Sequence, residues 1–179
     1  VAVQGLGSVG FYLCEHLHKD GAKLIVTDIN QHAISRAVEQ FGAVAVGLDD
    51  IYTVDADIYA PCALGATLNT DTINRLKCAI VAGAANNQLA EEAVHGKMLS
   101  EKGIIYAPDF LINAGGLINV YSELTGYNRE RALQQTEKIF DYTLDIHGKA
   151  ATENIPTYLA ATRMAEKRIA DIGRVKLGM

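Results

Sequence analysis

The sequence predicts an α/β fold with a doubly wound, mostly parallel sheet and a helical C-terminal tail. A short apolar run at residues 1–4 leads directly into Gly5-x-Gly7-x-x-Gly10. Compact apolar runs with little alternation then alternate with helical patterns, as expected for parallel strands that are covered on both faces. After Pro108 the patterns are helical only. Together these observations predict a Rossmann-type sheet.

Each element has a local signal. Apolar spacing predicts a first helix that Gly21 closes, and a second helix that Asn30 caps and Gly42 stops. Further helices follow from periodicity and from Gly103 at the end of one of them. We expect strands over 1–4, 23–27, 43–46, 57–60, 79–82 and 104–107, and helices over 8–20, 31–41, 70–76, 89–102, 114–124, 128–149 and 157–172.

Composition limits the class of protein. The 179 residues suit one domain of ordinary size, and a net charge of −5 argues against a nucleic-acid partner. The three cysteines lack paired spacing, so we expect neither disulfides nor a metal site. Reduced cysteines favour a cytoplasmic location. Without a long apolar run, no membrane span is expected. Because Val1 already lies in the first strand, we expect a domain taken from a longer protein.

The glycine turn predicts dinucleotide binding. Gly5 turns the chain off the strand, Gly7 lets the backbone approach a pyrophosphate, and Gly10 lets the next helix pack closely. The N-terminus of that helix favours phosphate through its free N–H groups and dipole. Such a turn is weak evidence alone, but here a strand precedes it, a helix follows it, and Asp28 lies at the expected distance.

Asp28 favours NAD over NADP. It ends the second predicted strand, where a carboxylate accepts hydrogen bonds from the ribose hydroxyls and repels a 2′-phosphate. The following residues, Ile29 to Gln31, supply no Arg or Lys for that phosphate. The alternative interpretation of Asp28 is a solvated acid at a helix start.

Three later turns fall at the same predicted edge of the sheet. Residues 61–65 are mostly small, so they either leave room for a flat ring or form an ordinary turn. Cys62 has no nearby base in the sequence that would make it a nucleophile. The carboxamides of Asn86 and Asn87 suit ribose, nicotinamide or substrate, although such pairs are also common in turns. Asn113 is expected both to cap the helix that follows it and to contact a ligand, because the N–H groups of a capped helix that faces the cleft allow either role.

The motifs GLGSVG, VTDIN, APCALG, NNQL, YAPDFLINAGG, GYNRERA and NIPTYLAATRMAEKRI occur in the order and spacing of the leucine dehydrogenases, which the chain resembles over essentially its whole length. Those enzymes belong to the glutamate, leucine, phenylalanine and valine dehydrogenase superfamily. The resemblance identifies residues 1–179 as the C-terminal NAD-binding domain. It implies reversible, NAD-dependent oxidative deamination of branched-chain L-amino acids to 2-oxo acids and ammonia, and a homo-oligomer.

The resemblance also implies the site. Cofactor contacts are expected from Gly5, Leu6, Gly7, Ser8, Val9, Gly10, Asp28, Ile29, Cys62, Ala63, Asn87 and Asn113, and a substrate pocket from Asn87, Leu117 and Val120. Glutamate-specific relatives carry a serine at the position of Val120. A substrate carboxylate facing valine and leucine would lose water without gaining a partner, so we expect an aliphatic pocket.

No catalytic residue is expected in this chain. In the family, one lysine acts as general base and a second holds the substrate carboxylate, and both lie in an N-terminal substrate domain. The histidines do not converge and are expected on the surface or in the core. Two alternatives remain: a non-catalytic module that senses NAD and NADH, and a methyltransferase-type domain, which the pyrophosphate-fitted turn disfavours.

Overall fold

The computed structural model describes residues 1–124 and 126–176. Its contacts divide the chain into two compact units, one of residues 1–113 and one that begins at Ala114. All six strands belong to the first unit. The second unit contains the helices α6, α7 and α8.

The first unit is built on a parallel sheet with the strand order β3-β2-β1-β4-β5-β6. Its strands are β1 (Ala2–Gln4), β2 (Ile25–Thr27), β3 (Val44–Ala45), β4 (Ile58–Pro61), β5 (Ile80–Val81) and β6 (Ile105–Tyr106). All five neighbouring pairs are parallel. β1 and β4 lie side by side with Ala2 opposite Tyr59. The strand order reverses between them, which is where sheets of this type bind ligands.

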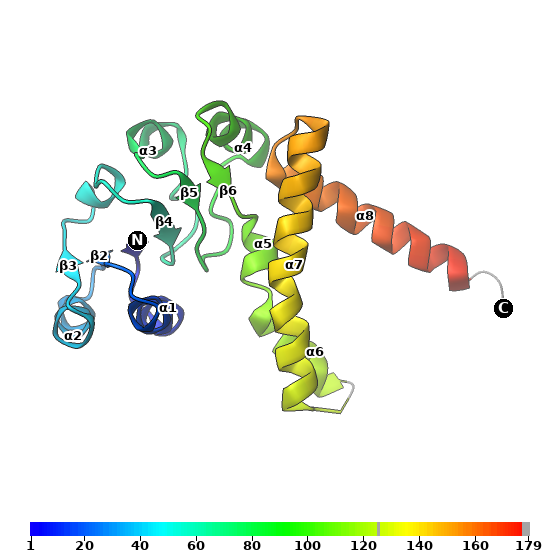
Figure 1. The fold of residues 1–179 in the computed structure, drawn as a ribbon, viewed down its shortest axis with the longest axis horizontal. Helices are drawn as coiled ribbons and strands as arrows, with labels where there is room; N and C mark the ends of the chain where they lie inside the picture. The colour runs from blue at the N-terminus through cyan, green and yellow to red at the C-terminus, as the bar shows by residue number, and fades with distance from the viewer. Residues whose placement is uncertain (125, 177–179) are drawn as a thin grey trace. The chain divides into compact units, whose positions relative to one another are not determined.

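Helices cover both faces of this sheet, which confirms the predicted doubly wound architecture. The structure has α1 (Ser8–Lys19), α2 (Gln31–Phe41), α3 (Thr70–Arg75), α4 (Glu92–Glu101) and α5 (Asp109–Ile112), together with the 3₁₀ helix η1 (Asp50–Tyr52). Figure 1 shows α1 and α2 on one side of the strands and α3 and α4 on the other.

The predicted ends of α2, which rest on capping residues in the sequence, are confirmed. The Asn30 side chain accepts hydrogen bonds from the N–H groups of His32 and Ala33 at the start of α2. Gly42 ends α2 with a φ of 63°, in the left-handed region that a glycine adopts without strain. Both ends of this helix are therefore specified by local chemistry.

Tertiary pairing changes the start of α4. The prediction of a helix from residue 89 is wrong, because Leu89 forms a parallel bridge with Leu68 and the helix begins at Glu92. The N–H of Leu68 donates to the carbonyl of Gln88, and the N–H of Ala90 donates to the carbonyl of Leu68. Backbone groups engaged in this way cannot form a first helical turn.

A buried polar cluster joins the central strands to η1. The Gln4 side chain on β1 donates to the hydroxyl of Tyr52 at 2.9 Å and accepts from the hydroxyl of Tyr59 on β4. Burial raises the pKa of Tyr59 far above its usual value, so this hydroxyl remains a donor. Every member of the cluster has a partner, which removes the usual cost of buried polar groups.

The second unit consists of α6 (Gly115–Leu124), α7 (Arg129–Glu153) and α8 (Thr157–Lys176). α7 packs against both α6 and α8. Most of the buried positions are small, which lets the helices approach closely: Ser122, Ala132, Ile146, Ala150, Ala160 and Ala161. α7 runs past the predicted end at residue 149 and stops at Asn154, which has a φ of 51°.

Among the described residues, no helix combines the length and the apolar character that a membrane crossing requires.

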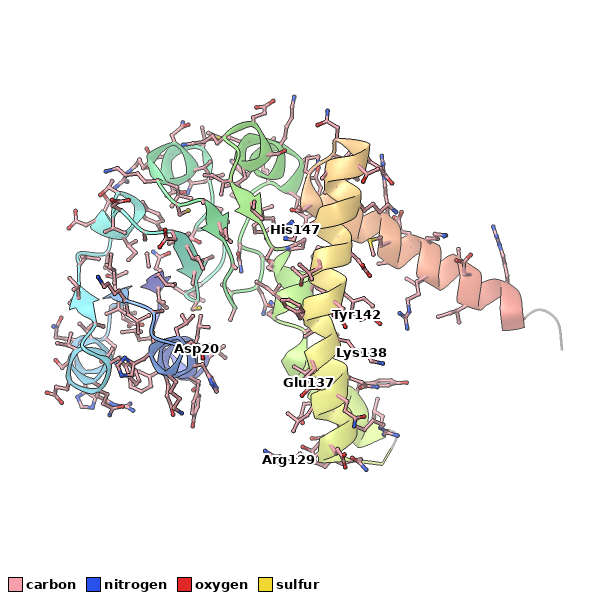
Figure 2. The ribbon with its side chains drawn as sticks, in the orientation of Figure 1. Asp20, Arg129, Glu137, Lys138, Tyr142 and His147 are labelled. Atoms are coloured by element: carbon pink, nitrogen blue, oxygen red, sulfur yellow. The ribbon has the colours of Figure 1, made fainter. Side chains whose placement is uncertain are left out.

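His147 on α7 makes the stability of the second unit depend on pH. Figure 2 labels this side chain, and burial lowers the pKa of its imidazole. Because the unfolded chain then binds the proton more tightly, the free energy of unfolding is highest above the unfolded pKa and falls as the pH drops through the folded pKa.

We therefore expect the stability lost between about pH 8 and pH 5 to be smaller in His147→Gln than in the original chain. Urea denaturation followed by circular dichroism at several pH values measures the difference. Identical pH profiles for the two proteins would contradict the assignment.

Candidate functional site

The predicted cofactor residues lie at one edge of the sheet, on the loops that follow the strands and in the first turn of α1. Because all strands are parallel, the loops that follow β1, β2, β4, β5 and β6 leave from their carboxyl ends. In open parallel sheets this edge carries the ligand site.

Gly5 packs directly on the loop that follows β4. It has a φ of +99°, and its N–H donates to the carbonyl of Thr27 at 2.8 Å. A Cβ at this position would lie 2.6 Å from the backbone nitrogen of Ala63 and 2.7 Å from the carbonyl carbon of Cys62. Only glycine satisfies both the backbone conformation and the close approach.

Gly10 and Gly7 differ in their surroundings. A Cβ on Gly10 would lie 2.0 Å from the Gly5 carbonyl oxygen, so the first turn of α1 rests on the glycine turn itself. Gly7 is exposed, and a Cβ there would meet nothing within 4 Å. As the N-cap of α1, Gly7 has no side chain to accept from the first-turn N–H groups. This helix end is therefore open to an anion such as a pyrophosphate.

Asp28 connects the glycine turn to the loop after β2. One carboxylate oxygen accepts from the N–H of Leu6 at 2.5 Å and the other from the N–H of Asn30 at 2.6 Å. These bonds fix the carboxylate beside the glycine turn, and each oxygen retains capacity to accept another hydrogen bond. The neighbouring Ile29 is 89% exposed. The arrangement fits a ribose with an apolar ring beside it.

Cys62 and Ala63 follow β4 and form the other wall of the glycine turn. The N–H of Cys62 donates to the carbonyl of Gln4 at 2.7 Å, which continues the pairing with β1. Burial raises the pKa of the Cys62 thiol, so it is a thiol at neutral pH. A protonated thiol is a poor nucleophile, so the chemistry of this position is confined to packing and contact.

The loop after β5 carries Asn86 and Asn87 at the same edge. Asn87 has a φ of 51°, in the left-handed region that asparagine tolerates. Its carbonyl accepts from the N–H of Ala66 at 2.6 Å. A Cβ on Gly65 would lie 2.6 Å from the carbonyl oxygen of Asn86, so the loops after β4 and β5 touch through their backbones.

Two buried side chains that the sequence analysis did not assign hold this loop. Gln88 is fully buried, and its Nε2 donates to the carbonyls of Gly83 at 2.6 Å and Ala85 at 3.0 Å. The Asp109 carboxylate accepts from the N–H of Gln88 at 3.0 Å and from that of Phe110 at 2.8 Å. An acidic residue two positions after the end of the sixth predicted strand was the available signal.

Asn113 does not cap α6, so that part of the prediction is wrong. It follows α5, a short helix that the sequence analysis did not predict, and its N–H donates to the carbonyl of Asp109. Its side-chain Nδ2 donates to Oδ1 of Asn86 at 2.6 Å. The structure thus joins the loops after β5 and β6 through their asparagine side chains.

The predicted pocket residues Leu117 and Val120 lie on α6 in the second unit. They are 72% and 59% exposed. With Tyr121 and Leu124 they follow the i, i+3, i+4, i+7 spacing of one helix face. α6 therefore presents a continuous, exposed apolar stripe.

His95 has structural partners at both ring nitrogens. His95 is buried; its Nδ1 accepts from the N–H of Glu91 at 2.9 Å and its Nε2 lies 3.2 Å from the hydroxyl of Thr70. Within the described part of the chain, no group of three or more His, Cys, Asp or Glu side chains is arranged to hold a metal ion.

Comparison with known proteins defines the family. The model of the glutamate/leucine/phenylalanine/valine dehydrogenase family matches residues 26–176. The chain belongs to this family. A leucine dehydrogenase from Thermoactinomyces intermedius is 63% identical over 94% of the chain, and an L-tryptophan dehydrogenase from Nostoc punctiforme is 50% identical over 98%.

Solved structures agree with this assignment. The crystal structure of L-tryptophan dehydrogenase from Nostoc punctiforme superimposes with a TM-score of 0.93 at 49% identity, covering 95% of this chain and 52% of that one. A glutamate dehydrogenase from Thermus thermophilus, at 21% identity, shares the fold with a TM-score of 0.72. The chain spans about half the length of the curated relatives it matches. Family and fold together imply a nicotinamide cofactor.

The two glycines provide a matched pair for testing the packing of the turn. We expect Gly10→Ala to lower the free energy of unfolding by about 3 kcal/mol, because the new methyl meets backbone that cannot move aside. Gly7→Ala, with open space around it, should change stability by less than about 1 kcal/mol. Urea denaturation measures both values, and equal losses would contradict the packing described here.

Proposed function

We propose that the protein to which this chain belongs is an NAD-dependent dehydrogenase that deaminates branched-chain L-amino acids reversibly to 2-oxo acids and ammonia. The observation that carries the proposal is the 63% identity to a leucine dehydrogenase over 94% of the chain. Other leucine dehydrogenases are 56% to 58% identical over 96% to 98% of it. The family match gives no support to the non-catalytic sensing module.

NAD as the cofactor is supported by the surroundings of Asp28. We assign the pyrophosphate to the open N-terminus of α1 at Gly7 and the adenosine ribose to the Asp28 carboxylate. Ile29, Cys62 and Ala63 contribute the apolar and small surfaces of the adenine side. A 2′-phosphate would meet the negative charge of Asp28, which disfavours NADP.

The nicotinamide and the substrate are assigned to the other half of the edge. Asn87 and Asn113 supply amides without charge, suited to ribose hydroxyls and to polar groups of the amino acid. From the family resemblance we assign an aliphatic pocket for the substrate side chain to Leu117 and Val120 on α6. One methylene in such a pocket changes binding by only about 1–3 kcal/mol, so leucine, isoleucine and valine are expected to share it.

In this proposal the chain itself binds the cofactor and orients the reacting groups. Bound NAD would supply the hydride acceptor for the amino-acid Cα. The glycine turn and Asp28 hold the dinucleotide, and the amides orient the reacting ends. The lysines that would act as general base and bind the substrate carboxylate are assigned to an N-terminal substrate domain outside these residues. Assembly as a homo-oligomer is also proposed, from the family resemblance.

Removal of one charge tests the cofactor assignment. We expect the chain to bind NADH more tightly than NADPH. In Asp28→Asn the ratio of the NADPH Kd to the NADH Kd should fall by about tenfold, because the amide no longer repels a 2′-phosphate. Asp20→Asn removes the same charge at the C-terminal end of α1 (Figure 2) and should leave the ratio unchanged. Fluorescence titration with both nucleotides measures the ratios. Equal affinity of the original chain for NADH and NADPH would refute the assignment.

A substrate panel tests the activity. A longer protein, in which this chain follows an N-terminal substrate domain, should oxidise leucine and valine with NAD and show little activity with glutamate, because the pocket offers no partner to a second carboxylate. The 179 residues alone should bind NADH and release no ammonia from leucine. Steady-state assays with leucine, valine, phenylalanine and glutamate decide the question, and strong glutamate activity would exclude the aliphatic pocket.

A further inference from the structure

The side-chain pair between Asn86 and Asn113 has a role that the assigned contacts do not explain. Nδ2 of Asn113 donates to Oδ1 of Asn86 at 2.6 Å, between the loops that follow β5 and β6. Both residues belong to the first unit. Asn86 is exposed and Asn113 is partly buried, so the pair lies at the surface of the ligand edge.

The pair is not needed to hold the two loops together. Asp109 already joins them through its hydrogen bond from the N–H of Gln88 at 3.0 Å, in a buried position. Gln88 ties its own loop to the carbonyls of Gly83 and Ala85. The backbone at Asn86 is also pressed against Gly65. The backbone on both sides is therefore fixed without the Asn86 side chain.

The pair acts instead on the orientation of the Asn113 amide. The terminal torsion of an asparagine is broad and nearly twofold, so a free amide presents either its oxygen or its nitrogen to a ligand. The bond to Asn86 uses one N–H of Asn113 and leaves its Oδ1 free to accept. In this arrangement Asn113 presents an acceptor, whereas the reversed pair, in which Asn86 donates to Asn113, would present a donor; Asn86→Asp allows only the first.

We propose that Asn86 is a positioning residue that orients Asn113 so that its Oδ1 accepts a hydrogen bond from an N–H donor of the bound ligand. The inference rests on the proposed function for the identity of that ligand. In that setting the donor is a neutral or charged nitrogen, either the carboxamide of the cofactor or the amine of the amino acid. A ligand carboxylate or phosphate does not fit an acceptor.

The first test needs no ligand. The side-chain amide of Asn113 should give a shifted, slowly exchanging NMR signal in the ¹⁵N-labelled chain, retained in Asn86→Asp, which keeps an acceptor oxygen, and lost in Asn86→Ala. Asn74→Ala, a second exposed asparagine on α3, is the control and should leave the signal unchanged. A signal that survives Asn86→Ala would overturn the inference.

The second test measures binding. Asn86→Ala should weaken NADH binding by about three- to tenfold, the range of one net hydrogen bond, while Asn86→Asp should stay within about twofold of the original chain. Reduced 3-acetylpyridine adenine dinucleotide, which lacks the carboxamide N–H, should bind equally well to both variants if the carboxamide is the donor. In an Asn113→Ala background, Asn86→Ala should have no further effect.

A third measurement separates the two donors. If NADH affinity is unchanged, the amine is the donor, and the KM for leucine in the longer protein should rise in Asn86→Ala with little change in kcat. The inference fails if neither quantity changes by more than about twofold, or if Asn86→Asp is as defective as Asn86→Ala. If the original chain binds no NADH while the NMR signal behaves as expected, the proposed function fails and the amide pair stands.

Discussion

Contact between the glycine turn and the end of β4 is the constraint on which the rest of the ligand edge depends. Gly5 lies against the backbone of Cys62 and Ala63, and Gly10 lies against Gly5. No side chain fits at either position, so β1, α1 and β4 converge on one point. This convergence places the open N-terminus of α1 at the reversal of the strand order. Asp28 is then held beside the turn by backbone N–H groups on both sides.

The other half of the edge is organised by buried polar groups. Asp109 and Gln88 are buried, and together they hold the loop after β5 against the start of α5. The side chains of Asn86 and Asn113 take no part in this buried framework and pair with each other. Rigid, buried hydrogen bonds set the backbone, and short polar side chains on that backbone are oriented by one another. The same logic applies at Asp28, where the carboxylate is fixed by backbone donors and retains acceptor capacity.

Features with a local cause could be predicted from the sequence. Asn30 and Gly42 mark the ends of α2 by capping and by a left-handed backbone, and both are present in the structure. The predicted start of α4 and the predicted helix cap at Asn113 were wrong for the same reason. Leu89 forms a backbone bridge with Leu68. Asn113 follows a short helix, and its side chain donates a hydrogen bond to that of Asn86. Partners distant in sequence outweighed the local preference in both cases.

The class of sheet, the glycine turn, the position of Asp28 and the family could all be predicted from the sequence, because each depends on spacing along the chain. Which loops meet became known from the folded arrangement of the strands. It showed that Gly10 rests on Gly5, that Asp109 joins the loops after β5 and β6, and that the Asn113 amide donates to Asn86. These facts follow from the distances between strands that are neighbours in space. Such distances cannot be predicted from the spacing of residues along the chain.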